Sequence, residues 1–376
     1  MPSLMPLHDF KLERFLAQYE FSAPHLLCTS DCESLHLADL LAMEDGAEER
    51  FRDLWLGYTE STGSPEVRRE VARMYSTLGP DEILLTAGAE ESIYLCMHAM
   101  LHPGDHAVVM SPAYQSLHEV ARSIGCRVSP WTLRDEDGWR PDIEALKDLV
   151  TRETEAVVIN TPHNPTGCHM TLEEFRAVRD IAEDAGAWVF SDEVYRLLEY
   201  DPADRLPPMA DIYEKGVSVG VMSKAFGLAG LRIGWTATQD ADLRRRVATL
   251  KDYTTICCSA PSEFLTALAL RHTDEIVGRN LGIIRSNLAL LDAFFARHTD
   301  LFNWIRPTAG AIGFPRLLTG ESAEDFAVRT VQASGVLLLP STAYEYGDSH
   351  FRVGFARTDM PAALQTFEDY LDGKTA

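Results

Sequence analysis

Lysine is scarce in this chain: only six lysines occur among 376 residues, and 34 Lys and Arg stand against 57 Asp and Glu. The resulting net charge of −23 repels phosphate backbones and anionic lipid headgroups. We therefore expect no nucleic acid and no membrane among the partners. A solvated acidic surface is the simplest interpretation of the charge.

Long apolar runs are also missing, since none approaches the roughly 20 residues that cross a bilayer. The first residues, MPSLMPLHDFKLERF, lack the apolar core and cleavage site of a signal peptide. We expect a cytoplasmic protein. Its seven cysteines are scattered, with no paired CxxC sets, which favours reduced and mostly buried thiols and no metal site.

Apolar runs rich in β-branched residues alternate with amphipathic stretches over residues 45–265. This alternation is typical of an α/β domain, in which helices cover a mainly parallel sheet. Helices are predicted at 89–100 and 172–185, among others. The predicted strands are 82–86, 106–110, 127–131, 156–160, 187–191, 217–222 and 232–236.

The rest of the chain has a different pattern. A helical stretch opens at 262–271 and continues through 280–298, and the C-terminal part mixes strands with an amphipathic tail. No internal repeats or Gly/Ser linkers mark a boundary. We predict an N-terminal arm and part of a small domain at 1–44, a large domain at 45–265, and a C-terminal small domain at 266–376.

Lys224 stands out because it follows the predicted strand 217–222, in the segment SKAFGLAGLRIGW. Most lysines are solvated surface charges. A turn at a strand end inside a cleft instead lets a lysine lose its proton and attack an aldehyde, which forms a Schiff base. The segments that precede Lys224 favour this second interpretation.

Polar side chains follow two other predicted strands. Asp192 and Tyr195 lie in SDEVY at the end of strand 187–191, and Asn164 lies in NTPHNPTG after strand 156–160. Side chains at the carboxyl ends of parallel strands project into one crevice. There Asp192 can keep a pyridinium nitrogen protonated, and amide or hydroxyl donors can bind a phenolic oxygen. A helix N-cap is the alternative role for Asp192.

An anion site is predicted where strand 82–86 meets helix 89–100. The connecting turn holds Gly88, Ala89 and Glu90, and backbone N–H groups at such a helix start can approach a phosphate closely. Arg232, eight residues after Lys224, supplies a second anion contact with fork geometry.

Four segments in this order, NTPHNPTG, SDEVY, SKAFGLAGLRIGW and FRVGFA, resemble class I/II aminotransferases of PLP fold type I, the aspartate aminotransferase superfamily. The resemblance extends from about Leu35 to the C-terminus. It implies a large α/β domain with a mainly parallel seven-stranded sheet between helices, and a smaller α+β domain built from both termini. It also implies the cofactor pyridoxal 5′-phosphate (PLP) and a homodimer with shared active sites.

The resemblance also implies roles for individual residues. Lys224 is the expected Schiff-base lysine and proton carrier, Asp192 pairs the pyridine nitrogen, and Arg352 in FRVGF clamps the substrate α-carboxylate. Core packing for Tyr114 and a surface ion pair for Arg352 are the alternatives. The other implied contacts are Gly88, Ala89, Glu90, Ser223 and Arg232 at the phosphate, Tyr58 at the phosphate of the neighbouring subunit, Tyr114 stacked on the ring, and Asn164 and Tyr195 at the phenolic oxygen, with Asn164 also beside the substrate.

Three segments depart from the family pattern. Residues 27–35 stand where a Gly-x-Pro-Asp type segment covers the substrate, 339–344 replace a Pro-Gly-Ser sequence, and 310–313 replace a glycine-glycine-aromatic pattern. The chain start and the Ser30-Asp31 stretch are similar to enzymes of lincosamide and capreomycidine biosynthesis. We therefore expect unusual substrate choice.

Transamination of an L-amino acid, through a Lys224 Schiff base and a stabilised Cα carbanion, is the leading hypothesis. A PLP-dependent lyase, decarboxylating deaminase or cyclase of natural-product biosynthesis is the alternative, because all these reactions share their first steps. A third hypothesis is a non-catalytic effector-binding domain fused to a DNA-binding module. The net charge of −23 and the lack of an N-terminal helix-turn-helix region argue against it.

Overall fold

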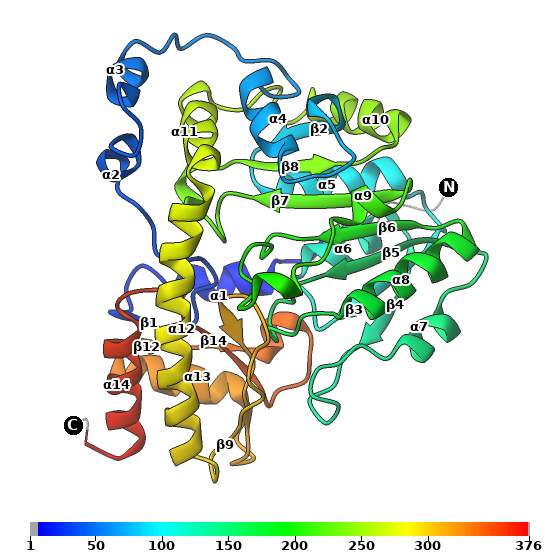
Figure 1. Ribbon diagram of the computed structural model, residues 1–376. Coiled ribbons are helices and arrows are strands. Elements are labelled where there is room, and N and C mark those ends of the chain that lie inside the picture. The colour runs from blue at the N-terminus through cyan, green and yellow to red at the C-terminus, as the bar shows by residue number, and fades with distance from the viewer. Residues whose placement is uncertain (1–6, 375–376) are drawn as a thin grey trace.

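The computed structural model describes residues 7–374, and its centre is a seven-stranded sheet in the order β2-β8-β7-β6-β5-β3-β4 (Figure 1). All neighbours from β7 to β4 pair in parallel, whereas β8 runs antiparallel to both β2 and β7. The predicted α/β class and mainly parallel sheet are confirmed. The strands are β2 Ile83–Thr86, β3 His106–Ser111, β4 Arg127–Thr132, β5 Thr154–Asn160, β6 Trp188–Asp192, β7 Gly216–Val221 and β8 Gly234–Ala237.

Each strand coincides with a predicted apolar run to within two residues at either end. β2, β6 and β7 are buried at every position, because helices cover both faces of the sheet. β4 is more exposed, as expected for a strand at the edge. The apolar runs predicted the strands well because a strand covered on both faces has no solvent-facing side, so polar residues do not interrupt its apolar sequence.

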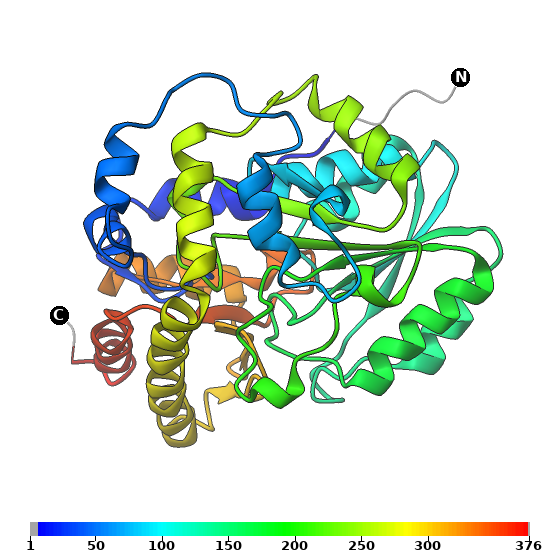
Figure 2. The same cartoon turned by 45° about the horizontal axis from the view of Figure 1, so that its top comes forward.

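Helices form two groups on opposite sides of the sheet (Figure 2). α5 packs against α6 and α10 in one group, and α7 packs against α8 in the other. α5 and α8 begin and end where predicted. The helices of this part are α4 Pro65–Ala72, α5 Ala89–Met100, α6 Ser116–Ile124, α7 Ile143–Leu149, α8 Leu172–Ala185, α9 Met209–Ile212 and α10 Ala241–Lys251.

The C-terminal part follows α11 (Ala260–Arg271) and α12 (Thr273–Arg297), which together confirm the predicted helical stretch. β14 (Phe351–Gly354) is the middle strand of an antiparallel sheet with β10 and β13. β1 (His25–Leu26) pairs in parallel with β12 (Val336–Leu337), so the N-terminal segment joins the C-terminal part, as expected. The domain boundaries at 44 and 265 stay predictions. The remaining elements are α1 Lys11–Tyr19, α2 Leu37–Leu41, α3 Ala47–Arg52, α13 Ala323–Ser334, α14 Met360–Leu371, β9 Phe302–Asn303, β10 Ile312–Gly313, β11 Arg316–Leu317 and β13 Leu339–Pro340.

None of the helices within residues 7–374 is long and apolar enough to cross a membrane. The first six residues, part of the stretch expected to lack a signal peptide, lie outside the described residues. All seven cysteines are free, and five of them are buried. The described part of the chain holds no cluster of three metal-binding side chains.

A segment around α2 and α3 extends away from the sheet at the upper left of Figure 1. It continues through Trp55, Leu56 and Tyr58, whose exposed fractions are 78%, 75% and 86%. Three large apolar or aromatic side chains this exposed within four residues are unusual for a surface that faces only water.

Candidate active site

A cavity of about 370 Å³ is lined by side chains that follow the carboxyl ends of β5, β6 and β7. The N-terminal helix α1, the segment that contains Ser30 and Asp31, the start of α5 and β14 also line it, together with Tyr114, Arg232 and Arg357. Pairing of Asn160 with Asp192 in the sheet brings the ends of β5 and β6 to the same level. All predicted site residues except Gly88 and Tyr58 line this cavity.

Lys224 is presented to the cavity by the turn that ends β7. Its Nζ atom donates a hydrogen bond to Ser30 Oγ at 2.8 Å and lies 5.6 Å from the centre of the Tyr195 ring. Burial lowers the pKa of Lys224, and the Asp31 and Asp192 carboxylates act in the opposite direction. A lowered pKa favours the neutral amine, which is the nucleophilic and basic form.

Asp192 ends β6 and is 4% exposed. Within residues 7–374, the only hydrogen bond to its carboxyl group is from the Val194 N–H to Oδ1, at 3.2 Å. Burial raises the pKa of Asp192 to about 7, against the Val194 hydrogen bond and the nearby charge of Lys224. A protonated ring nitrogen placed beside this carboxylate would supply the missing countercharge.

Asn164, Tyr344 and Arg352 form a buried hydrogen-bond network. Tyr344 Oη donates to Asn164 Oδ1 at 3.0 Å and accepts from Arg352 Nη1 at 2.6 Å. Arg352 also donates through Nε and Nη2 to the Cys28 carbonyl oxygen, at 3.0 and 2.7 Å. Because Asn164 Oδ1 is occupied, its Nδ2 is the group free to donate into the cavity. Arg352 is only 3% exposed, so the surface ion pair considered for it is wrong.

The start of α5 forms a tight cradle with Arg232. A Cβ atom added at Gly88, where φ is 91°, would lie 2.8 Å from Arg232 Nη2, and one added at Gly234 would lie 2.8 Å from the Ala89 nitrogen. Only glycine fits at both positions, so backbone N–H groups and a guanidinium converge there. Such a cradle suits the phosphate of PLP.

Tyr195 is 1% exposed, and its Oη atom has no hydrogen-bond partner within the described chain. A buried hydroxyl without a partner is costly, and a phenolic oxygen in the cavity would satisfy it. Tyr114 also lines the cavity, and its ring centre is 5.0 Å from that of Phe10. The residues therefore fit PLP at the ring nitrogen, the phenolic oxygen and the phosphate.

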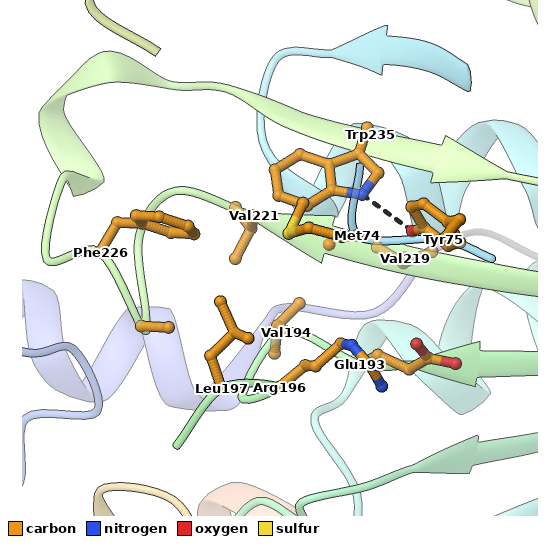
Figure 3. A pocket seen from close by; sticks show the side chains of 12 residues that line it. Met74, Tyr75, Glu193, Val194, Arg196, Leu197, Val219, Val221, Phe226 and Trp235 are labelled. Atoms are coloured by element: carbon orange, nitrogen blue, oxygen red, sulfur yellow. Dashed lines mark hydrogen bonds between the residues drawn. The ribbon is translucent and has the colours of Figure 1, made fainter. Parts of the chain in front are cut away.

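Figure 3 shows a second, smaller cavity of about 20 Å³, separated from the first by Val194 and Val221, which line both. It has room for about one water molecule and cannot hold an amino acid. Glu193 lies at its wall, and Glu193 Oε1 accepts hydrogen bonds from the Met209 N–H at 2.9 Å and Ser218 Oγ at 2.8 Å. These bonds fix the backbone next to Asp192.

Sequence reasoning missed two contributors to the cavity, helix α1 and Ser30, and also missed Tyr344, which bonds to Asn164 and Arg352 behind the cavity wall. Helix α1 was not predicted, although Leu12 and Leu16 have the spacing of one helix face. It also supplies Glu13, and Glu20 follows directly after its last residue. Ser30 and Tyr344 belong to segments that depart from the family pattern, and no role at the site was predicted for either residue. Tyr58 is exposed and lies outside the cavity of its own chain.

Comparison with known proteins identifies the family. Residues 27–365 match the model of aminotransferase class I and II. Capreomycidine synthase of Streptomyces vinaceus is 30% identical over 97% of this chain and 93% of that protein.

Two solved structures are similar over nearly their whole length. A PLP-dependent aminotransferase from Streptococcus suis 89-1591 superimposes with a TM-score of 0.92 at 32% identity, covering 98% of both chains. The PLP-dependent cyclase OrfR superimposes with a TM-score of 0.89 at 30% identity, covering 99% of this chain and 100% of that one. The chain therefore belongs to the class I and II aminotransferase family and is a PLP-dependent enzyme of the aminotransferase type.

Proposed function

We propose that this enzyme removes the amino group of an L-amino acid by transamination, with Lys224 as the residue that binds PLP and carries the proton. The observation that supports it best is the convergence on one cavity of a half-buried lysine, a buried aspartate and a buried arginine. These are Lys224, Asp192 and Arg352.

PLP, when bound, withdraws electrons from the bonds to the substrate Cα, so that a proton can leave. The chain's own residues do the rest. The neutral amine of Lys224 would accept the Cα proton as general base and then, as general acid, deliver it to the cofactor carbon C4′, so that the amino group stays behind when the keto acid leaves. Asp192, ionised beside the ring nitrogen, would keep that nitrogen positively charged. Asn164 Nδ2 and Tyr195 Oη would donate hydrogen bonds to the phenolic oxygen.

Arg352 is proposed to bind the substrate α-carboxylate. Its guanidinium is fully buried and has no carboxylate partner within residues 7–374, only the Cys28 carbonyl oxygen, Tyr344 Oη and Asn164 Oδ1. A buried cation that lacks an anion favours binding one. The planar fork matches a carboxylate in two parallel hydrogen bonds.

The charges of the cavity favour a substrate with a cationic side chain. Once PLP and the α-carboxylate engage the basic groups, the carboxylates of Glu13, Glu20 and Glu90 remain at the wall. Glu13 and Glu20 have no salt-bridge partner among the described residues, and burial together with Glu13 and Asp31 raises the pKa of Glu20. An ammonium or guanidinium group of the substrate would relieve this repulsion.

A panel of amino acids tests this function. Arginine, ornithine and lysine, compared with aspartate, alanine and phenylalanine, should convert the bound cofactor to its amine form most rapidly, with release of a keto acid. Conversion by aspartate alone would contradict the cationic assignment. Borohydride reduction followed by peptide mapping should label Lys224, and labelling of another lysine would overturn the site.

A cyclising or eliminating reaction of natural-product biosynthesis is the second candidate. It is favoured by the names of two relatives, capreomycidine synthase and the cyclase OrfR, which match nearly the whole chain. Turnover without accumulation of the amine form of the cofactor, with a cyclised or eliminated product, would establish it instead of transamination.

We also propose a cytoplasmic homodimer in which Tyr58 reaches the phosphate site of the partner subunit. The support is the exposed side chains of Trp55, Leu56 and Tyr58 on a segment that extends from the body of the chain.

A further inference from the structure

The N-terminal segment that replaces the family's substrate loop is anchored by backbone hydrogen bonds. Leu27 N–H donates to the Leu337 carbonyl at 3.1 Å, and the Leu27 carbonyl accepts from Gly354 N–H at 2.9 Å. Further along, Glu33 N–H donates to the Ala356 carbonyl at 2.8 Å. The segment is thus fixed to the C-terminal part on both sides of Ser30.

Two glycines allow this segment to approach closely. A Cβ atom at Gly354 would lie 1.7 Å from the Thr29 carbonyl oxygen, and one at Gly227 would lie 2.5 Å from the Glu33 carbonyl oxygen. Gly354 belongs to the strand of Arg352, and Gly227 follows Lys224 in the turn after β7. The backbone around Ser30 is therefore held against both the carboxylate-binding strand and the lysine turn.

The side chain that this arrangement brings to Lys224 is a neutral hydroxyl. Ser30 Oγ accepts the hydrogen bond from Lys224 Nζ at 2.8 Å. The neighbouring Asp31 carboxylate is engaged elsewhere, because it accepts from Arg357 Nη2 at 2.7 Å. The Lys224 amine therefore donates to a fixed neutral hydroxyl and forms no close ion pair with Asp31.

The amine in this structure is the same chemical species that substrate binding would free. An amine that donates one N–H to a fixed acceptor has the direction of its lone pair restricted. When the amine takes a proton and becomes ammonium, the same hydrogen bond becomes charge-assisted and stronger.

We propose that Ser30 is a positioning residue for Lys224: its hydroxyl accepts a hydrogen bond from the freed amine and directs the lone pair of that amine toward the substrate Cα. This inference rests on the proposed role of Lys224 as proton carrier. It gives a function to a segment that departs from the family pattern.

The first test uses the cofactor-free protein with ¹⁵N-labelled lysine. With six lysines in the chain, a Lys224→Arg variant assigns the Lys224 signal. Ser30→Ala should lower the pKa of Lys224 by about half a unit to one unit, because the ammonium loses an acceptor. Asp31, Cys32, Asp192, Tyr195 and Arg352, which also surround the amine, are the same in every variant.

Two further variants serve as controls for this titration. Ser30→Thr keeps the hydroxyl and should restore the wild-type pKa. Ser34→Ala removes an exposed hydroxyl from the same segment and should leave the pKa unchanged. An unchanged titration in Ser30→Ala would overturn the inference.

The second test measures exchange of the substrate Cα proton with deuterated water in the PLP-loaded enzyme. Ser30→Ala should slow exchange about three- to tenfold, the effect of one lost hydrogen bond, with little change in KM. A raised KM with an unchanged exchange rate would show a substrate contact instead and contradict the proposal. Failure to label Lys224 in the wild type would overturn the proposed function and this inference together, whereas labelled Lys224 with normal exchange in Ser30→Ala would overturn the inference alone.

Discussion

The protonation state of Asp192 depends on whether a positive charge lies beside its buried carboxyl group. Burial raises the pKa of its carboxyl from the usual 3.8 to about 7 in the cofactor-free chain. The folded state therefore favours protonated Asp192, and the stability that this preference provides is complete below about pH 4 and lost as the pH rises through about 7. Under the proposed function, the ring nitrogen of PLP would be the charged partner of this carboxylate.

We expect Asp192→Asn to remove this pH dependence. Relative to the variant, the cofactor-free wild type should lose on the order of 2–4 kcal/mol of stability between pH 4 and pH 7. Urea unfolding of both proteins across that range measures the difference. In the PLP-loaded enzyme we expect the wild type to be more stable to unfolding than the variant, because PLP should bind the variant much more weakly. A constant difference in unfolding free energy at all pH values would contradict the assigned cause.

Tyr344 links the two groups proposed to contact substrate and cofactor. Its hydroxyl bonds to both Arg352 and Asn164, so it sets the orientation of a guanidinium and an amide at once. Tyr344→Phe keeps the ring and removes only these bonds. We expect KM to rise about tenfold, with a smaller change in kcat, since a hydrogen bond to a charged group contributes roughly 1.5–3 kcal/mol. An unaltered KM would show that Arg352 needs no such support.

At the level of elements, the strands and the helices α5 and α8 were predictable because their signals are local. α8, for example, starts at a capping box in which Thr171 and Glu174 each bond the backbone of the other. The motifs at strand ends were predictable for a related reason, since a parallel sheet places them at one edge. Ser30 and Tyr344 carry no such local signal. They reach Lys224 and Asn164 across 194 and 180 residues of chain, so only the tertiary fold shows their roles.

Helix α1 is the element whose charges are proposed to select the substrate. It has nine residues and packs by Leu12 and Leu16, and its Glu13, with Glu20 just beyond its end, faces the cavity. A helix this short depends on tertiary packing for its stability, so the local sequence did not predict it.

Glu20→Gln removes one of these charges with little change in shape. We expect KM for a cationic amino acid to rise about tenfold, because a charge-assisted contact is replaced by a neutral one, while KM for an uncharged amino acid stays the same. Glu144→Gln, which removes an exposed carboxylate of α7 away from the cavity, is the matched control and should change neither value. Equal effects on both substrates would argue that Glu20 acts on the structure of the site and not on substrate charge.

At the scale of the whole molecule, the two parts of the chain contribute different functions to one cavity. The large α/β part supplies Lys224 and Asp192 at its strand ends and, at the start of α5, the cradle proposed for a phosphate, and the C-terminal part supplies Arg352 on β14. The N-terminal segment, paired through β1 and β12, closes the cavity between them. Sequence motifs predicted the first two contributions, whereas the third depends on contacts between the two ends of the chain.

The exposed segment at Trp55, Leu56 and Tyr58 gives the last prediction. If it covers a partner subunit, light scattering should give twice the chain mass of 41.9 kDa, and Trp55→Asp with Leu56→Asp should yield a monomer with weakened PLP binding. Tyr58→Phe should remain dimeric but release PLP about tenfold more readily, because it loses only a hydrogen bond to the partner's phosphate. An active wild-type monomer would contradict the shared site, and a dimeric Tyr58→Phe with unchanged PLP affinity would separate the interface from the phosphate contact.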